Sequence, residues 1–162
     1  METIYLAGGC LWGVQHFMRS VPGVIFTEAG RANGSTNTLD GPYDGYAECV
    51  KVDFDEAVTS AYKMTEHLFE IIDPYSVNKQ GVDVGLKYRT GVYSMCSRHL
   101  EEARAFINAR SDRDKIVVEV LPLTNYVRSA DEHQDHLERI PEDCSYCHIP
   151  SEIMDKYRIN HN

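Results

Sequence analysis

The chain has 162 residues, 43% of them hydrophobic and 25% charged, which is the composition of one ordinary globular domain with its own core. Sixteen basic residues against 25 acidic ones give a net charge of −9. This charge excludes a surface that neutralises nucleic-acid phosphates or anionic lipid. The first residues contain neither a basic segment nor an apolar run of membrane-spanning length. We therefore expect a single domain over residues 1–162, located in the cytoplasm, with no nucleic-acid or membrane partner.

The strands and helices are predicted in chain order from apolar periodicity. A strand, a helix and two further strands are expected at 3–7, 11–20, 24–29 and 46–54. The run 31–45 is rich in Gly, Asn, Thr and Asp and is predicted to be a long loop. Beyond it we expect a helix that stops at Asp73-Pro74, a strand, a helix and a strand, at 59–72, 90–94, 97–109 and 116–121.

The order strand, helix, strand, strand, helix, strand matches a split ferredoxin-like βαββαβ unit with extensions. Such a unit is an α+β two-layer sandwich, with helices on one face of a mainly antiparallel sheet. The polar segment after residue 121 predicts only a short helix at 131–139. Residues 140–162 are expected to form a largely irregular, mobile C-terminal tail.

The chain contains five cysteines: Cys10, Cys49, Cys96, Cys144 and Cys147. An odd number of cysteines without an export signal disfavours a structural disulfide framework. Catalytic, metal-binding and inert roles remain. A lone cysteine is most often a small buried hydrophobe, and this is the role expected for Cys49 and Cys96.

Cys10 lies where a predicted strand gives way to a predicted helix, directly after Gly8 and Gly9. The unpaired N–H groups and the dipole of a helix N-terminus favour a thiolate at such a position. The glycines allow a tight turn. Trp12, the only tryptophan, follows two residues later. The pattern indicates either a nucleophilic thiol beside an apolar pocket or a glycine turn with an ordinary buried cysteine.

Glu48 belongs to the alternating strand 46–54 and is in phase with Tyr46, Val50, Val52 and Phe54. Burial on that apolar face would raise the pKa of its carboxyl group by desolvation. A carboxylic acid that stays neutral near pH 7 is what a general acid requires. A solvated or ion-paired glutamate is the alternative that the pattern leaves open.

The aperiodic segment 81–89 contains paired glycines, the carboxylate of Asp83 and the phenol of Tyr88. Functional groups held on a loop have this composition. An ordinary surface turn has it as well, so the segment alone does not indicate a site.

Cys144 and Cys147 form a close pair in the polar tail, followed by His148. The spacing fits a redox pair, half of a zinc site, or the Cys-x-x-Cys-His pattern of c-type haem attachment. Haem attachment requires an export signal. Zinc would recruit His133 and His136, which lie on one face of a helix, to complete a Cys₂His₂ site. A zinc-binding or redox-sensing module is therefore the alternative to a redox pair on a mobile segment.

Together these segments resemble the peptide methionine sulfoxide reductases of the A type, over residues 7–150. Residues 8–13 are similar to the family's Gly-Gly-Cys-Phe-Trp-Gly, and 45–48 to its Gly-His-Ala-Glu. Residues 78–89 resemble Asn-Arg-Gln-Gly-Asn-Asp-x-Gly-x-x-Tyr-Arg, with Asp83 and Tyr88 at its substrate-binding positions. Residues 130–137 are similar to Ala-Glu-x-Tyr-His-Gln-x-Tyr-Leu, and Tyr146-Cys147 to the family's tail Tyr-Cys.

The chain departs from the family pattern around the expected pocket. Leu11 replaces a phenylalanine, so Trp12 remains as the aromatic wall of the pocket for the sulfoxide methyl group. Tyr46 replaces the histidine before the glutamate. The upstream substrate-binding tyrosine falls at Thr36 in an ungapped alignment, and the Val-Cys-Ser-Gly that follows it is absent. The phenol of Tyr43 or of Tyr46 is the candidate replacement.

The resemblance implies an oxidoreductase that needs no cofactor or metal and acts on methionine S-sulfoxide, free or in peptides. Cys10 would attack the sulfoxide sulfur while Glu48 donates a proton to the oxygen, leaving Cys10 as a sulfenic acid. Cys147, which matches the tail motif, is the first choice to resolve this acid. Cys144 would then move the disulfide to the surface, where thioredoxin or a similar dithiol reduces it.

Overall fold

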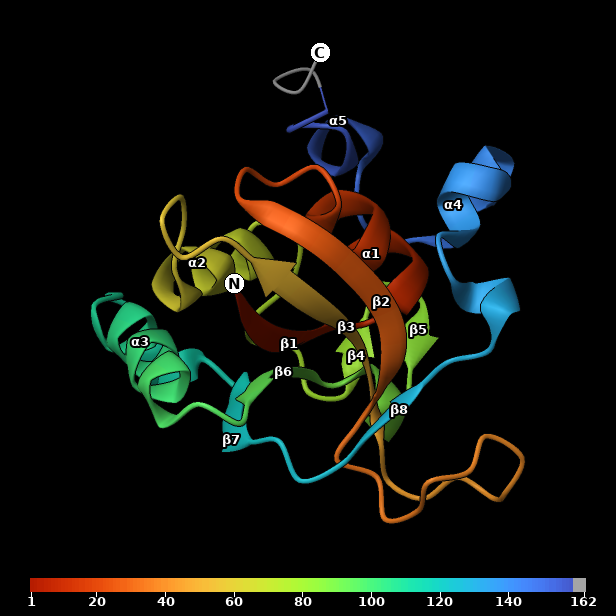
Figure 1. The fold of residues 1–162 in the computed structure, drawn as a ribbon, viewed down its shortest axis with the longest axis horizontal. Helices are drawn as coiled ribbons and strands as arrows, with labels where there is room; N and C mark the ends of the chain where they lie inside the picture. Colours follow the sequence, from red (N-terminus) through yellow and green to blue (C-terminus); the bar gives the residue numbers. More distant parts are fainter. Residues whose placement is uncertain (159–162) are drawn as a thin grey trace.

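The computed structural model describes residues 1–158, which form a mixed α+β fold around one curled six-stranded sheet (Figure 1). All neighbouring strands pair antiparallel except β6 and β7, which are parallel. The spatial order is β7 (Glu119–Pro122), β6 (Thr90–Ser94), β1 (Glu2–Gly8), β3 (Ala47–Phe54), β2 (Val24–Ala32) and β8 (Tyr126–Arg128). No helix within residues 1–158 is long and apolar enough to cross a membrane.

Three longer α-helices pack beside the sheet, and two short ones follow in the C-terminal segment. They are α1 (Leu11–Met18), α2 (Ala61–Phe69), α3 (Ser97–Asn108), α4 (His136–Arg139) and α5 (Ser151–Met154). A small separate hairpin consists of β4 (Lys79–Gln80) and β5 (Asp83–Val84). Short 3₁₀ helices cover Leu86–Tyr88, Arg113–Lys115, Asp131–His133 and Pro141–Tyr146.

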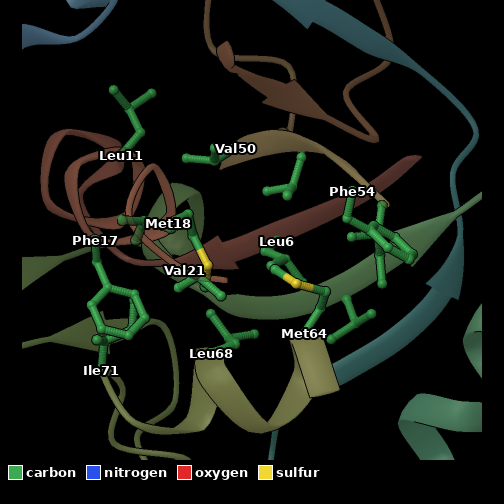
Figure 2. Close-up of a cluster of buried hydrophobic side chains, with 14 of the residues drawn as sticks. Leu6, Leu11, Phe17, Met18, Val21, Val50, Phe54, Met64, Leu68 and Ile71 are labelled. Atoms are coloured by element: carbon green, nitrogen blue, oxygen red, sulfur yellow. The ribbon is translucent and has the colours of Figure 1, made fainter. Parts of the chain in front are cut away.

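The main core lies between the sheet and α1 and α2. Figure 2 shows Leu6, Val50 and Phe54 of the strands facing Met18 of α1 and Met64 of α2. The buried positions of β3 confirm the predicted phase of this strand, because Val50, Val52 and Phe54 belong to the main core. Glu48, two residues before Val50, lies on the same face of β3.

A smaller apolar cluster covers the opposite face of the sheet and includes Tyr5, Cys49 and Tyr93. Cys49 is 1% exposed, as predicted for an inert buried cysteine. Cys96 differs from that expectation, since it is only partly buried at the start of α3. Its position at the helix N-cap places it at the end of the sheet rather than inside the core.

The predicted strands and longer helices are all present, with ends shifted by up to three residues. The hairpin β4–β5 and the edge strand β8 were not predicted. Their strands have only two or three residues, which is too short to produce a recognisable alternation.

The described part of the tail is not irregular, so that prediction is wrong for residues 140–158. Pro141–Tyr146 form a 3₁₀ helix and α5 follows it. Ile149 and Met154 are 4% and 3% exposed and belong to the main core. Isolated apolar residues in a polar segment give no periodic signal, yet each one buries apolar area that favours docking. The last four residues of the predicted tail, 159–162, lie outside the described residues, and the mobility of the tail stays a prediction.

The predicted helix 131–139 is interrupted at Gln134 and Asp135. Asp135 has a φ of 51°, and the Gln134 side chain leaves the helical path to reach the sheet. Its Oε1 accepts a hydrogen bond from Ala29 N at 2.8 Å, and its Nε2 donates to the carbonyls of Ala29 and Ser129, both at 2.9 Å. These three bonds attach the segment that carries His133 to the edge of β2.

Gln134→Ala is expected to lower the free energy of unfolding by about 1–3 kcal/mol, because it leaves the buried N–H of Ala29 without a partner and removes one bond each from the carbonyls of Ala29 and Ser129. Glu132→Ala, at an exposed neighbouring position, is the control and should change stability by less than about 0.5 kcal/mol. Urea denaturation measures both values. Equal effects of the two substitutions would contradict the anchoring role of Gln134.

Candidate active site

The sharp turn between β1 and α1 positions Cys10 at the N-cap of α1. Gly9 has a φ of +90°, a conformation that residues with a side chain rarely adopt. A Cβ at Gly9 would lie 2.7 Å from Cβ of Gln80 and 3.1 Å from Cε1 of His148. The missing side chain thus allows the hairpin β4–β5 and the C-terminal segment to meet beside Cys10.

Cys10 opens onto a cavity of about 320 Å³ that also contains Glu48. Seven of the residues predicted from the sequence line this cavity: Cys10, Leu11, Trp12, Tyr46, Glu48, Asp83 and Tyr88. They come from the first turn of α1, the start of β3 and the segment from β5 to the 3₁₀ helix Leu86–Tyr88. One pocket therefore combines a thiol, a carboxylic acid, an indole and two phenols.

Glu48 is largely withdrawn from water in this cavity. Burial raises the pKa of its carboxyl group to about 7, while the Lys87 cation and the backbone N–H of Leu11 act in the opposite direction. Asp83 adds to the upward shift through charge repulsion. Glu48 is therefore a carboxyl group that holds its proton up to neutral pH, as a general acid requires.

Trp12 is fixed by two histidines. Its Nε1–H donates to Nδ1 of His133 at 3.2 Å, and the ring of His136 stacks on the indole at 3.7 Å between centroids with 8° between the planes. His136 is itself held at both ring nitrogens, by the Glu132 carbonyl at 3.1 Å and by the Asp143 carboxylate at 2.7 Å. The indole is consequently a rigid apolar wall of the cavity.

Cys147 lies against Cys10 on the side of α1. The two thiols lie close enough for each to shift the pKa of the other, and Sγ of Cys147 is 3.3 Å from where a Cβ at Gly13 would be. The neighbouring Cys147 thiol and burial together raise the pKa of Cys10, and the Cys10 thiol lowers the pKa of Cys147. This direction is opposite to the thiolate expected at Cys10, because the neighbouring thiol and burial outweigh the backbone N–H of Trp12.

Cys144 lies elsewhere. It is exposed and lines a separate groove between α4 and α5, together with His16 and Met154. The backbone joins the two tail cysteines directly, since Cys147 N donates to Cys144 O at 3.1 Å.

The residues of the zinc hypothesis do not form a ligand set. His133 is bonded to Trp12 and His136 to Asp143, while the Cys147 thiol lies beside Cys10. Among residues 1–158, no group of three or more His, Cys, Asp or Glu side chains is placed to hold a metal ion. The zinc alternative thus finds no geometric support in this part of the chain.

The structure separates the candidates for the missing tyrosine. Thr36 binds the carboxylate of Asp44 through its N–H and its hydroxyl, at 2.8 and 2.7 Å, outside the cavity. Tyr46 lines the cavity, whereas Tyr43 packs edge-on against the Tyr46 ring and donates to the Tyr46 carbonyl at 2.6 Å. Tyr43 supports Tyr46 and does not itself line the cavity.

Sequence reasoning missed Arg31, Lys87 and Ser129 in the cavity wall, and it assigned His133 only to zinc. Arg31 faces Glu48 across the β2–β3 pair. That contact depends on strand register, which the long loop between these strands leaves undefined in the sequence. Lys87 precedes Tyr88 and carried no signal of its own.

Comparison with known proteins supports one family. A model of the family described as peptide methionine sulfoxide reductase matches residues 2–162. Peptide methionine sulfoxide reductase MsrA of Clostridium perfringens is 40% identical over 161 residues, covering 92% of this chain and 98% of the relative. The reduced form of Mxr1 from Saccharomyces cerevisiae superposes with a TM-score of 0.81 at 27% identity, covering 87% of this chain and 86% of that one. A complex of Mxr1 with Trx2 resembles it in fold, with a TM-score of 0.60 at 22% identity over 83% and 84% of the two chains.

A buried carboxylic acid and a thiol in one pocket, with a second thiol beside the first, fit a thiol-dependent oxidoreductase. The matches over nearly the whole chain make the identity specific: the chain belongs to the peptide methionine sulfoxide reductase family. It is an enzyme that acts on a sulfur group.

The raised pKa of Glu48 predicts a stability that depends on pH. The folded-state value of about 7 lies above the ordinary 4.5, so the folded chain binds this proton more tightly than the unfolded chain. Protonated Glu48 therefore adds its full contribution to the free energy of unfolding below the ordinary pKa of 4.5. This contribution is lost as the pH rises through the folded-state pKa of about 7. Relative to wild type, Glu48→Gln should gain up to about 3 kcal/mol between about pH 4 and about pH 8.

Denaturant titrations of both proteins at the two pH values measure this difference. Glu132→Gln, at an exposed position, is the matched control and should show no such gain. A Glu48→Gln effect that is independent of pH would mean that Glu48 does not hold a proton at neutral pH.

Proposed function

We propose that this chain reduces the S epimer of methionine sulfoxide, with Cys10 as the nucleophile and Glu48 as the proton donor. The observation that carries the proposal is that both residues and Trp12 line one cavity, with the Cys147 thiol beside Cys10. Reduction of a sulfoxide by two thiols yields the thioether, a disulfide and water. This set of residues supplies the thiols and the first proton.

In the first step the sulfur of Cys10 attacks the sulfoxide sulfur while Glu48 protonates the leaving oxygen. The protonated oxygen then passes from the substrate sulfur to the Cys10 sulfur, and the bond between the two sulfurs breaks, so that methionine departs and Cys10 is left as a sulfenic acid. The substrate methyl group contacts the apolar surface of Trp12 and Leu11.

In the second step Cys147 attacks the sulfenic acid, and the hydroxyl leaves as water after accepting a proton. The position of Cys147 supports this step, because its thiol acts on that of Cys10 and its sulfur lies next to Gly13 in the first turn of α1. The product is a disulfide between these two residues.

Cys144 is exposed and lies three residues before Cys147, so we assign it the third step. Its thiol attacks Cys147, which frees Cys10 and leaves a bridge between the two tail cysteines. A dithiol protein then reduces that bridge by exchange. Thioredoxin fits this role, in line with the Mxr1–Trx2 complex of the yeast protein.

The same proposal covers the architecture around the site. The order β6-β1-β3-β2, with α1 and α2 in the connections, supports a ferredoxin-like unit within one catalytic domain over residues 1–162. The tail 140–162 has to undock for the disulfide transfer and is therefore expected to be mobile during turnover. The five free cysteines fit a reducing compartment such as the cytoplasm.

A thioredoxin-coupled assay on the separate epimers tests the function. Wild type should reduce the S epimer and leave the R epimer unreduced.

Cys10→Ser should lose even a single turnover, because an alcohol is a far weaker nucleophile than a thiolate. Glu48→Gln should slow reduction by roughly 10²–10⁴-fold. Cys96→Ser is the matched control and should keep wild-type rates. Methionine formation by Cys10→Ser would overturn the assignment of the nucleophile.

The two tail cysteines are expected to give different phenotypes. Cys147→Ser should produce about one equivalent of methionine per chain and stall as the Cys10 sulfenic acid, detectable by a dimedone-type reagent. Cys144→Ser should stop at the bridge between Cys10 and Cys147, which thioredoxin reaches slowly in the buried site. Mass spectrometry of the stalled proteins distinguishes the two. Reversed phenotypes would make Cys144 the resolving cysteine.

A further inference from the structure

Two cations in the cavity wall have no part in the mechanism above. Arg31 of β2 lies directly opposite Glu48 in the β2–β3 register, and Lys87 belongs to the 3₁₀ helix that ends at Tyr88. Both side chains are partly buried, and both line the same cavity as Cys10. They come from separate elements, so the chain brings two positive charges together at the reacting centre.

Neither cation is neutralised within the described residues. The guanidinium carbon of Arg31 lies 4.4 Å from the ring centroid of Tyr46. The guanidinium also donates a long hydrogen bond of 3.5 Å to the Leu39 carbonyl. Nζ of Lys87 lies 5.1 Å from the ring centroid of Tyr88. By contrast, the adjacent Arg89 is paired with the carboxylate of Glu119 at 3.2 Å.

The charge balance of the cavity leaves room for an anion. Glu48 holds its proton up to neutral pH, so Asp83 is the one anionic side chain among the lining residues. Two cations against one carboxylate make the cavity positive in a chain with a net charge of −9. Withdrawing cations from water is unfavourable unless a partner compensates, and a carboxylate is the partner that both arginine and lysine accept.

The substrate itself offers such a group. In methionine sulfoxide three carbons separate the sulfur from the carboxyl carbon, so a sulfur held at Cys10 keeps its own carboxylate within the same cavity. An acidic side chain beside the oxidised methionine in a peptide presents the same chemistry. An amide-blocked residue presents none.

We propose that Arg31 and Lys87 form a carboxylate subsite, so that the enzyme prefers methionine sulfoxide with a carboxylate next to the sulfoxide side chain. This inference rests on the proposed function, because it takes the sulfoxide to be bound at Cys10. The carboxylate comes either from free methionine sulfoxide or from an acidic neighbour in a peptide. Both cations are specificity-determining residues that contact the substrate away from its reacting atoms.

The test compares three S-sulfoxide substrates: N-acetylmethionine sulfoxide, its methylamide, and a methylamide peptide with glutamate before the oxidised residue. Wild type should reduce the acid with a kcat/KM at least about 10-fold above that of the methylamide, mainly through a lower KM. Lys87→Met and Arg31→Gln should each lower the ratio of the two kcat/KM values by about 5–10-fold. High salt should lower the same ratio, since screening weakens the attraction.

Controls keep the outcome specific. Lys115→Met removes a charge of the same sign at an exposed position that does not line the cavity. It should leave the ratio at the wild-type value. Arg31→Lys keeps the charge beside Tyr46 and should restore part of the ratio if Arg31→Gln disturbs packing. Comparing the glutamate peptide with the free acid tells which source of the carboxylate the subsite accepts.

Turnover of the methylamide tests the proposed function. The ratio of kcat/KM for the acid to kcat/KM for the methylamide tests the subsite. Equal kcat/KM of wild type for acid and methylamide would overturn the subsite and leave the function standing. Equal losses on all substrates in Lys87→Met, with the pH profile of kcat shifted upward, would overturn it too. That result would make Lys87 a positioning residue that acts on Glu48. Absence of turnover with every substrate would overturn both proposals.

Discussion

The site depends on the close approach of three chain segments, which is possible because two positions lack side chains. At Gly9 the turn after β1 meets Gln80 and His148, and at Gly13 the first turn of α1 meets Cys147. A methyl group at Gly9 would overlap Gln80, and in a close-packed interior such overlap forces the neighbours apart. The contact between the two thiols and the shape of the cavity both follow from this arrangement.

The second constraint is electrostatic. Glu48 lies on the apolar face of β3. The free-energy cost of burying its charge keeps the carboxyl group protonated. Arg31 and Lys87 reduce this cost without removing it, since desolvation remains the larger effect. The cavity therefore holds a neutral acid beside two cations, an arrangement suited to a polar but uncharged sulfoxide oxygen and a nearby anion.

The features that were predicted from the sequence are those set by local pattern. The alternation in 46–54 placed Glu48 on the core face, and the glycine pair before Cys10 indicated the turn. The features that were missed depend on contacts between distant segments. Arg31 enters the site only through its register with Glu48, and residues 140–158 pack through isolated apolar side chains such as Ile149. The effect that raises the pKa of Cys10 was missed for the same reason, because Cys147 lies 137 positions later in the chain.

The fixation of Trp12 has an optical consequence. It is the only tryptophan of the chain, and its indole is stacked on His136 and bonded to His133 within the pocket wall. Fluorescence excited at the long-wavelength edge of the protein absorption band thus originates from the Trp12 indole alone. This ring lines the same cavity as Cys10. Any movement of the segment 131–147 that separates these rings changes the quenching by imidazole and the polarity around the indole. The protein thereby carries a built-in spectroscopic probe that would report such a movement without a label.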